Sequence, residues 1–406
     1  MGITTMDVSP VWRAGTIASA LAVIGILAGC ARPPQPGDPL PGLQRSERAR
    51  FDRGKEVFER EFTPETGLGP LFNSTSCGEC HEEPATGGFG DEVEVHATAF
   101  LARGPGNSPH VTGTPESVCD QLTDQGGPVV QQHVTPALHD ALGIDAEPVP
   151  PRATATGRRT SPSILGFGLL DTVPDQTILA YADPDDRDHD GVSGRPNRFT
   201  DGRIGRFGRK AFVPTLKEFN AGAFLIEQGI TSPPMPVEDT IGGKPIPPGV
   251  DPRPEPELSQ EDLDLAIDFV RFLAPPSGMV RLDSRRGERI FARIGCASCH
   301  VPTLKTGDSD VRALRKRKVA AYTDLLLHDM GPDLADICLG LAAPSEFRTE
   351  PLMGLRLRTR FLHDGRAATV EDAVRLHAGE ATAARDRFGT LSGDERQALL
   401  KFLASL

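Results

Sequence analysis

Tryptophan and net positive charge are what this 406-residue chain has least of. It contains one tryptophan, Trp12, and two tyrosines, and its formal net charge is −12 at pH 7. This acidity argues against nucleic acid as a partner, because phosphate binding needs clustered lysine and arginine. The basic run at residues 312–318 is either a solvated loop or a docking patch for an acidic redox partner.

The apolar run at residues 16–30 (TIASALAVIGILAGC) is too short to predict a membrane span and has the length of a signal-peptide core. The small residues before Cys30 match the bacterial lipobox, in which that cysteine is lipidated; a plain signal peptide is the alternative. We predict a lipoprotein signal peptide at residues 1–29 and a proline-rich tether at residues 30–48. The protein is then expected on the periplasmic side of the cell envelope, anchored in the membrane by lipid. Alanine after Cys30 favours the outer membrane.

Four of the seven cysteines form two CxxCH motifs. The first is Cys77, Cys80 and His81, and the second is Cys296, Cys299 and His300. A CxxC pair alone is ambiguous between zinc, thiol redox chemistry and haem. The adjacent histidine favours haem c, because two thioethers hold the haem while the imidazole binds its iron. Zinc would need further ligands close by. The sequence therefore predicts two covalent haems, with His81 and His300 as proximal iron ligands.

The remaining cysteines, Cys119 and Cys338, either form a disulfide in an oxidising compartment or stay as two buried free thiols.

The chain contains two copies of one plan. RGKEVF at residues 53–58 precedes the first motif, and RGERIF at residues 286–291 precedes the second. A helix capped by Ser259 follows the first motif, and one with Ser392 and Glu395 in a capping box ends the chain. We therefore predict a mainly α fold of two cytochrome c-like haem domains with long irregular loops. Their expected ranges are 49–275, which is enlarged by insertions, and 280–406.

The ligand on the far side of each iron decides the function of a haem. A second strong ligand makes an electron-transfer centre, whereas an open position lets peroxide or oxygen bind. Spacing alone does not choose among the many histidines and methionines of the chain.

Several longer segments carry a resemblance to a known family. Among them are SPSILGFGLLDTVPDQT at residues 161–177, CASCHVPTLKTG at 296–307, YTDLLLHDMGPDLAD at 322–336, and FLHDGRAATVEDAVRLHAGEA at 361–381. Together they resemble the di-haem oxidoreductase family, which is similar to bacterial di-haem cytochrome c peroxidases and MauG-type enzymes. The resemblance runs from about residue 50 to the C-terminus.

The resemblance implies roles for individual residues. His377 would be the distal ligand of the haem held by His300, and His96 the distal ligand of the haem held by His81. His363 resembles a structural histidine, whereas His328 and Met330 match a family motif without an assigned role. The family implies a distal acid or amide for proton transfer. The candidates for it are Asp171, Asp175 and Gln176; a turn or cap role is the alternative for Asp171.

A calcium site is a separate prediction from the residues themselves. Asp186, Asp188 and Asp190 alternate before Gly191, as in the first half of an EF-hand loop. The twelfth position is Asn197 instead of glutamate, which predicts weaker binding. A solvated acidic loop is the alternative.

The predicted mature chain lacks tryptophan, which related peroxidases place between their haems as an electron relay. Tyr181, Tyr322, a phenylalanine or the haem edges would then have to relay electrons. The expected function is a peroxidase-like oxidoreductase that takes hydrogen peroxide or oxygen. Its electrons would come from a small periplasmic cytochrome c or cupredoxin. The alternatives are an electron-transfer cytochrome with two six-coordinate haems and a redox-sensing, partner-binding lipoprotein.

Overall fold

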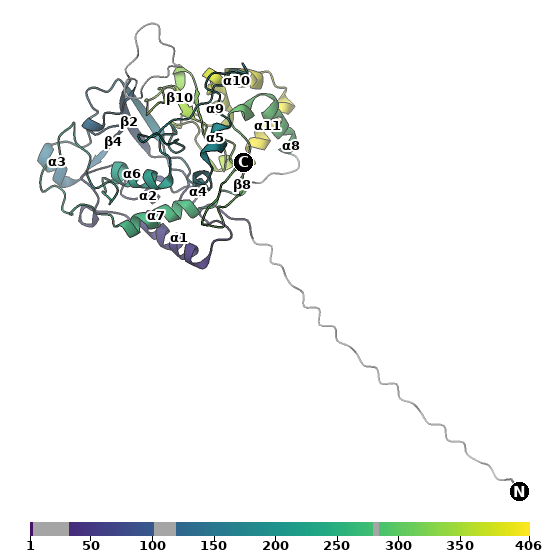
Figure 1. The fold of residues 1–406 in the computed structure, drawn as a ribbon, viewed down its shortest axis with the longest axis horizontal. Coiled ribbons are helices and arrows are strands. Elements are labelled where there is room, and N and C mark those ends of the chain that lie inside the picture. Colours follow the sequence, from purple (N-terminus) through teal and green to yellow (C-terminus); the bar gives the residue numbers. More distant parts are fainter. Residues whose placement is uncertain (3–31, 101–118, 279–283) are drawn as a thin grey trace. The chain divides into compact units, whose positions relative to one another are not determined.

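A computed structural model describes residues 1–2, 32–100, 119–278 and 284–406 (Figure 1). The chain divides into two units, residues 1–33 and residues 34–406. The predicted lipidation site Cys30 and nearly all of the predicted signal peptide lie outside the described residues. Among the described residues, no helix is long and apolar enough to cross a membrane.

Helix pairs repeat in the two halves of the larger unit. In the first half, α1 (Arg45–Phe58) packs along α7 (Gln260–Phe272), and in the second α8 (Arg285–Arg293) packs along α11 (Gly393–Leu403) (Figure 1). The other helices of the described residues are shorter or lie between these pairs. They are α2 (Cys77–Cys80), α3 (Pro136–Leu142), α4 (Phe167–Asp171), α5 (Asp175–Leu179), α6 (Leu216–Gln228), α9 (Val370–Leu376) and α10 (Thr382–Gly389).

One glycine in each copy allows the two helices of the pair to touch. A Cβ atom on Gly54 would lie 2.1 Å from the carbonyl oxygen of Leu265, and one on Gly287 would lie 2.2 Å from that of Ala398. Only glycine can occupy a position where another backbone comes this close. The RGxxxF repeat of the sequence is therefore a helix-contact motif, and the two copies are equivalent in structure.

Side-chain caps begin the closing helices, as the sequence predicted. Ser259 accepts a hydrogen bond from the backbone N–H of Asp262 at 3.1 Å and so caps α7. Ser392 and Glu395 form a capping box at the start of α11. Leu399, Phe402 and Leu403 form the buried face of that helix.

Strands are short apart from one sheet in the first half. Its central strand, β2 (Val93–Phe100), pairs antiparallel with β3 (Cys119–Asp120), β4 (Val129–Val130) and β6 (Ala155–Thr160). Three two-stranded ladders complete the strands of the described residues. They are β1 (Leu71–Phe72) with β5 (His133–Val134), β7 (Leu304–Lys305) with β8 (Lys318–Val319), and β9 (Leu327–Asp329) with β10 (Glu346–Arg348). Helices outweigh strands, so the mainly α prediction holds.

One buried apolar cluster spans the predicted domain boundary. Phe167, Leu170 and Phe269 from the first half pack with Leu304 and Leu325 from the second. The described residues from Pro34 onward accordingly form one compact unit. The division into domains at 49–275 and 280–406 stays a prediction.

The two cysteines outside the motifs form a disulfide. Cys119 and Cys338 are bonded, with their Cα atoms 5.7 Å apart, and this resolves the alternative that the sequence left open. The bond joins the end of the four-stranded sheet to a loop of the C-terminal half.

Removing this disulfide should lower stability. Replacing both Cys119 and Cys338 with alanine is expected to reduce the free energy of unfolding by about 2–5 kcal/mol, because the unfolded chain gains freedom. Denaturant titration without reductant would measure the loss, and wild type titrated with a thiol reductant is the matched comparison. Equal midpoints for the variant and oxidised wild type would contradict the prediction.

Candidate functional site

The first CxxCH motif forms a single helical turn. Ser76 caps it by accepting a hydrogen bond from the N–H of Gly78 at 3.0 Å. Cys77 and Cys80 are free and partly exposed. The Nδ1 of His81 lies 3.1 Å from the carbonyl oxygen of Gly88, to which it donates as an N–H. That bond fixes the tautomer and leaves Nε2 available to a metal.

The second motif repeats this arrangement. Cys296 and Cys299 are free, and Nδ1 of His300 lies 3.0 Å from the carbonyl oxygen of Tyr322. A phenylalanine of the preceding helix faces the histidine in each copy: Phe58 is 6.0 Å from His81, and Phe291 is 6.3 Å from His300, between ring centroids. Two free thiols followed by an imidazole with an open Nε2 fit covalent haem.

Thiol chemistry fits these cysteines poorly. Burial raises the pKa of Cys77 and of Cys296 to about 12. Reactive cysteines need a lowered pKa so that the thiolate forms near neutral pH. The raised pKa disfavours the thiolate that redox exchange needs, which agrees with the predicted use of these cysteines as haem attachment points.

His377, the predicted second ligand of the C-terminal haem, lies near His300. It follows α9, and its Nδ1 is 2.7 Å from the carbonyl oxygen of Ala373, so its Nε2 is also free. Burial lowers the pKa of His300 to about 4, and the neighbouring His377 contributes to the lowering. Two partly buried neutral imidazoles near each other, each with one free nitrogen, suit a six-coordinate iron.

Carboxylates gather near the first motif. His96 lies on β2 and places Nε2 3.1 Å from Oε2 of Glu94. Glu227 on α6 accepts a hydrogen bond from Nδ2 of Asn73 at 2.8 Å. Both Glu94 and Glu227 act electrostatically on the Cys80 thiol, so they lie near the motif. His96 as a distal ligand stays a prediction, since its Nε2 contacts a carboxylate in this structure.

The environments of Glu94 and Glu227 push their pKa values apart. Burial, together with the charge of Glu94, raises the pKa of Glu227 well above its usual range. Burial also opposes ionisation of Glu94, but its hydrogen bond to His96 and nearby positive charges hold its pKa below the usual range. Such a pair supplies one acid and one base at the same pH. Sequence reasoning missed both residues.

An open cavity of about 570 Å³ lies beside the first motif. Asn73, Glu79 and His133 are among the residues that line it. Asn73 also donates a hydrogen bond to Glu227, so the cavity wall connects directly to this partly buried acid.

The predicted catalytic residues are engaged in other contacts. Asp171 accepts a hydrogen bond from the N–H of Leu216 at 3.1 Å, at the start of α6, and burial raises its pKa. Asp175 forms an ion pair with Arg206, and Gln176 is exposed on α5. Their catalytic role stays a prediction, and the structure gives the first two a stabilising role.

The remaining motif histidines are buried in polar contacts. Nδ1 of His328 lies 2.7 Å from Glu380 and Nε2 lies 2.8 Å from Asp324. Nδ1 is also 3.5 Å from Sγ of Cys299, so His328 is part of the second haem site without offering a free nitrogen. The ring of His363 stacks on Phe347 at 4.4 Å between centroids, as suits a structural histidine.

The predicted calcium loop has its three carboxylates together. One oxygen from each of Asp186, Asp188 and Asp190 lies within 4.8 Å of the others. Asn197 does not join them: it is fully buried, and its Nδ2 donates to the carbonyl oxygens of Lys210 and Leu339. An EF-hand ligand at position twelve is thus absent, and calcium at the loop stays a prediction.

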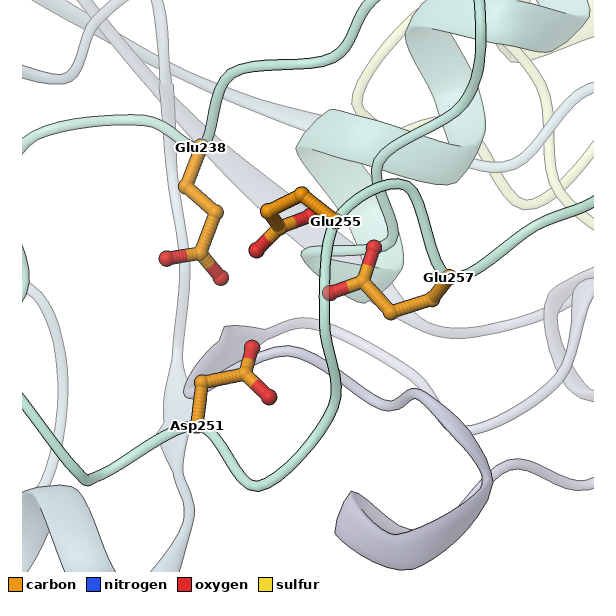
Figure 2. A group of neighbouring side chains, drawn as sticks. All are labelled: Glu238, Asp251, Glu255 and Glu257. Carbon is orange, nitrogen blue, oxygen red and sulfur yellow. The ribbon is translucent and has the colours of Figure 1, made fainter.

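A second group of carboxylates was missed by the sequence analysis. Glu238, Asp251, Glu255 and Glu257 point toward one another from loops between α6 and α7 (Figure 2). Thr231 donates its backbone N–H to Glu257 at 2.8 Å. Burial, a hydrogen bond to Asp251 and the neighbouring charges raise the pKa of Glu238 to about 9, and burial raises that of Glu257 to about 7. The raised pKa values favour protonated carboxyl groups here, and we assign no cation to the group.

This group predicts a pH-dependent stability. A carboxyl whose folded pKa is raised keeps its proton when the unfolded chain has lost it, so stability falls as pH rises. The free energy of unfolding should fall from about pH 5 up to the Glu238 pKa of about 9. Glu238→Gln should reduce the slope, as measured by denaturant unfolding at pH 5.5 and 8.5. The exposed Glu56→Gln is the control. A slope unchanged in Glu238→Gln would disprove this origin.

Comparison with known proteins identifies the family of the chain. No curated protein matches the chain. A family profile described as "Di-haem oxidoreductase, putative peroxidase" matches residues 152–406. That region contains the second CxxCH motif and His377, and it begins after the first motif.

Three solved structures illustrate the likeness at low identity. Hydrazine synthase of Kuenenia stuttgartiensis is 15% identical, with a TM-score of 0.39, over 99% of this chain and 100% of that one. A MauG-like protein associated with microbial copper homeostasis is 16% identical, with a TM-score of 0.40, over 92% of each chain. The diheme peroxidase BthA from Burkholderia thailandensis E264 is 16% identical, with a TM-score of 0.40, over 90% and 86%. Scores this low support no comparison of sites. The family profile, however, covers more than half of the chain, and the chain belongs to the di-haem oxidoreductase family.

Proposed function

We propose that the protein is an exported di-haem peroxidase-like enzyme, in which the N-terminal haem reacts with hydrogen peroxide and the C-terminal haem relays electrons to it. The observation that carries this proposal is the asymmetry of the two sites. His377, with a free Nε2, lies near His300, whereas Nε2 of His96 near the first motif contacts Glu94, and the acid Glu227 lies near the same motif. Two histidine ligands favour electron transfer, and an acid with a base favours peroxide chemistry.

The residues near the first motif would move the protons of the reaction. Haem supplies, when bound, the iron at which peroxide is reduced. Glu94, held ionised by His96, would accept a proton from hydrogen peroxide. Glu227, kept protonated by burial, would donate one to the oxygen that leaves as water. Asn73 would orient Glu227 through its hydrogen bond.

Export and partners complete the proposal. The Cys119–Cys338 disulfide supports a location outside the cytoplasm, since such bonds persist in oxidising compartments. A small periplasmic cytochrome c or cupredoxin would donate electrons. The charged side chains at residues 312 and 315–318 are exposed, which supports docking of an acidic donor there. Lipid anchoring at Cys30 and calcium at Asp186, Asp188 and Asp190 remain part of the prediction.

Electron paramagnetic resonance of the ferric and half-reduced protein tests the assignment. We expect one low-spin haem, and one high-spin signal that hydrogen peroxide abolishes. If both haems stay low-spin in both states and peroxide changes neither, the peroxidase proposal is wrong. An electron-transfer cytochrome with two six-coordinate haems would then replace it, with His96 as the additional ligand.

A further inference from the structure

Three buried or nearly buried arginines surround one partly buried glutamate, Glu350, in the C-terminal half. Oε2 of Glu350 lies 2.7 Å from Arg348 and 3.2 Å from Arg209, and Oε1 lies 2.8 Å from Arg358. The side chain of Arg348 is 1% exposed, and those of Arg209 and Arg358 are 11% and 12% exposed. One carboxylate thus faces three guanidinium groups, which leaves an excess of two positive charges inside the protein.

The neighbouring buried charges do not supply the missing anions. Asp336 pairs with both Arg159, at 2.7 Å, and Lys210, at 2.8 Å, so this group adds another positive charge. Burial lowers the pKa of Lys210 to about 7, and the charge of Arg159 adds to the lowering. Glu346 also faces Lys210, but it forms an ion pair with Arg195.

Donor groups of the three arginines are left without partners. The Nε–H groups of Arg209, Arg348 and Arg358 are buried and have no acceptor among the residues of the structure. A buried guanidinium with an unsatisfied donor is costly, and the planar fork of arginine is suited to carboxylates. Both the excess charge and the open donors therefore call for carboxylate groups from outside the chain.

Short stretches of backbone connect this arginine cluster to both CxxCH motifs. On one side, Arg209 donates to the carbonyl oxygen of Thr160 at 3.0 Å, and the carbonyl group of Pro162, two residues further along the chain, lies close to His81. On the other side, the N–H of Leu352, two residues after Glu350, donates to Ala321, which precedes the Tyr322 that holds His300.

We propose that Arg209, Arg348 and Arg358 form a carboxylate-binding site that the propionate groups of the two haems share. The inference rests on the binding of two haems, which the proposed function includes, but it does not require a peroxidase reaction. Each haem carries two propionates, so the two haems bring the anions that the cluster lacks. The cluster then links the haems electrostatically in a chain whose predicted mature form has no tryptophan between them.

Haem reduction potentials test this site without using enzyme activity. Reduction adds an electron, so removing a nearby buried positive charge makes it less favourable. Arg209→Gln and Arg358→Gln should each lower the equilibrium constant for reduction of both haems about tenfold, which corresponds to about 59 mV for one electron. Glu350→Gln removes a negative charge and should shift both potentials upward. Arg293→Gln is the control, because this arginine is 57% exposed in its pair with Glu395.

The outcomes separate this inference from the proposed function. Two results would overturn the carboxylate site. One is that the haem potentials stay unchanged in both arginine variants, and the other is that Glu350→Gln lowers the potentials, as the arginine variants do. Mass spectrometry must show that each variant carries two haems. Arg209→Lys keeps the positive charge, so its haem potentials should lie close to those of the wild type. A protein with these shifts but no peroxide turnover would keep the site and lose only the peroxidase proposal. Potentials that follow added acetate would show that a free anion, not propionate, occupies the cluster.

Discussion

Replacing Glu227 with glutamine is expected to lower kcat/KM for hydrogen peroxide about 100- to 1,000-fold while leaving both haems attached. Glutamine keeps the size of the side chain and can still pair with Asn73, but it cannot give up a proton to the leaving oxygen. The variant therefore removes the ability of residue 227 to donate a proton while leaving the packing of α6 unchanged. Steady-state assays with a reduced small cytochrome as donor would measure the loss.

The pH dependence gives a second test of the same residue. Burial raises the pKa of Glu227, and the reaction needs its protonated form. The wild-type kcat/KM should therefore fall as pH rises through that raised pKa, because the acid is lost. In Glu227→Gln this limb of the profile should disappear, which a purely structural role of Glu227 would not cause.

Glu56→Gln is the matched control for this experiment. Glu56 is exposed on α1, and its replacement should leave both the rate and the pH profile unchanged. If Glu227→Gln keeps wild-type activity, Glu227 is not the proton donor. The Asp171, Asp175 and Gln176 prediction would then be the next one to test.

The sequence predicted features that depend on neighbours along the chain. The CxxCH motifs, the caps at Ser259 and Ser392, and the repeated RGxxxF segments each combine residues within one or two helical turns. Local geometry along the chain is enough to predict the helical turns and caps that these residues form, and the structure contains those turns and caps. Gly54 shows the limit of this reasoning. The repeat is visible in the sequence, but the sequence does not show that α7 packs against this glycine.

Features that depend on distant segments were not predictable in this way. Glu227 looks like any helical glutamate in the sequence, and only the packing of α6 near the first motif buries it. The same is true of the carbonyl group of Tyr322, which holds His300, because no side-chain pattern marks a backbone acceptor. Asp171 and Asp175 drew attention through their motif, yet their contacts are with the start of α6 and with Arg206.

Only the family resemblance predicted His377 as an iron ligand. Replacing this residue gives the second large expected effect. His377→Gly should convert the low-spin C-terminal haem to a high-spin one, because the other imidazole near His300, that of His328, is held at both nitrogens by Glu380 and Asp324. Electron paramagnetic resonance would show the change directly. Peroxide turnover should fall at least tenfold, because the relay haem would lose the ligand that sets its potential.

Added imidazole distinguishes a ligand from a residue that only supports the fold. The free Nε2 of His377 is the atom that exogenous imidazole would replace in the cavity left by His377→Gly. We expect millimolar imidazole to restore the low-spin signal and part of the turnover, whereas the exposed His139→Gly should need no rescue. A low-spin spectrum that persists in His377→Gly without imidazole would mean that another residue binds this iron. The asymmetry between the two sites, on which the choice of the reactive haem rests, would then have to be reassigned.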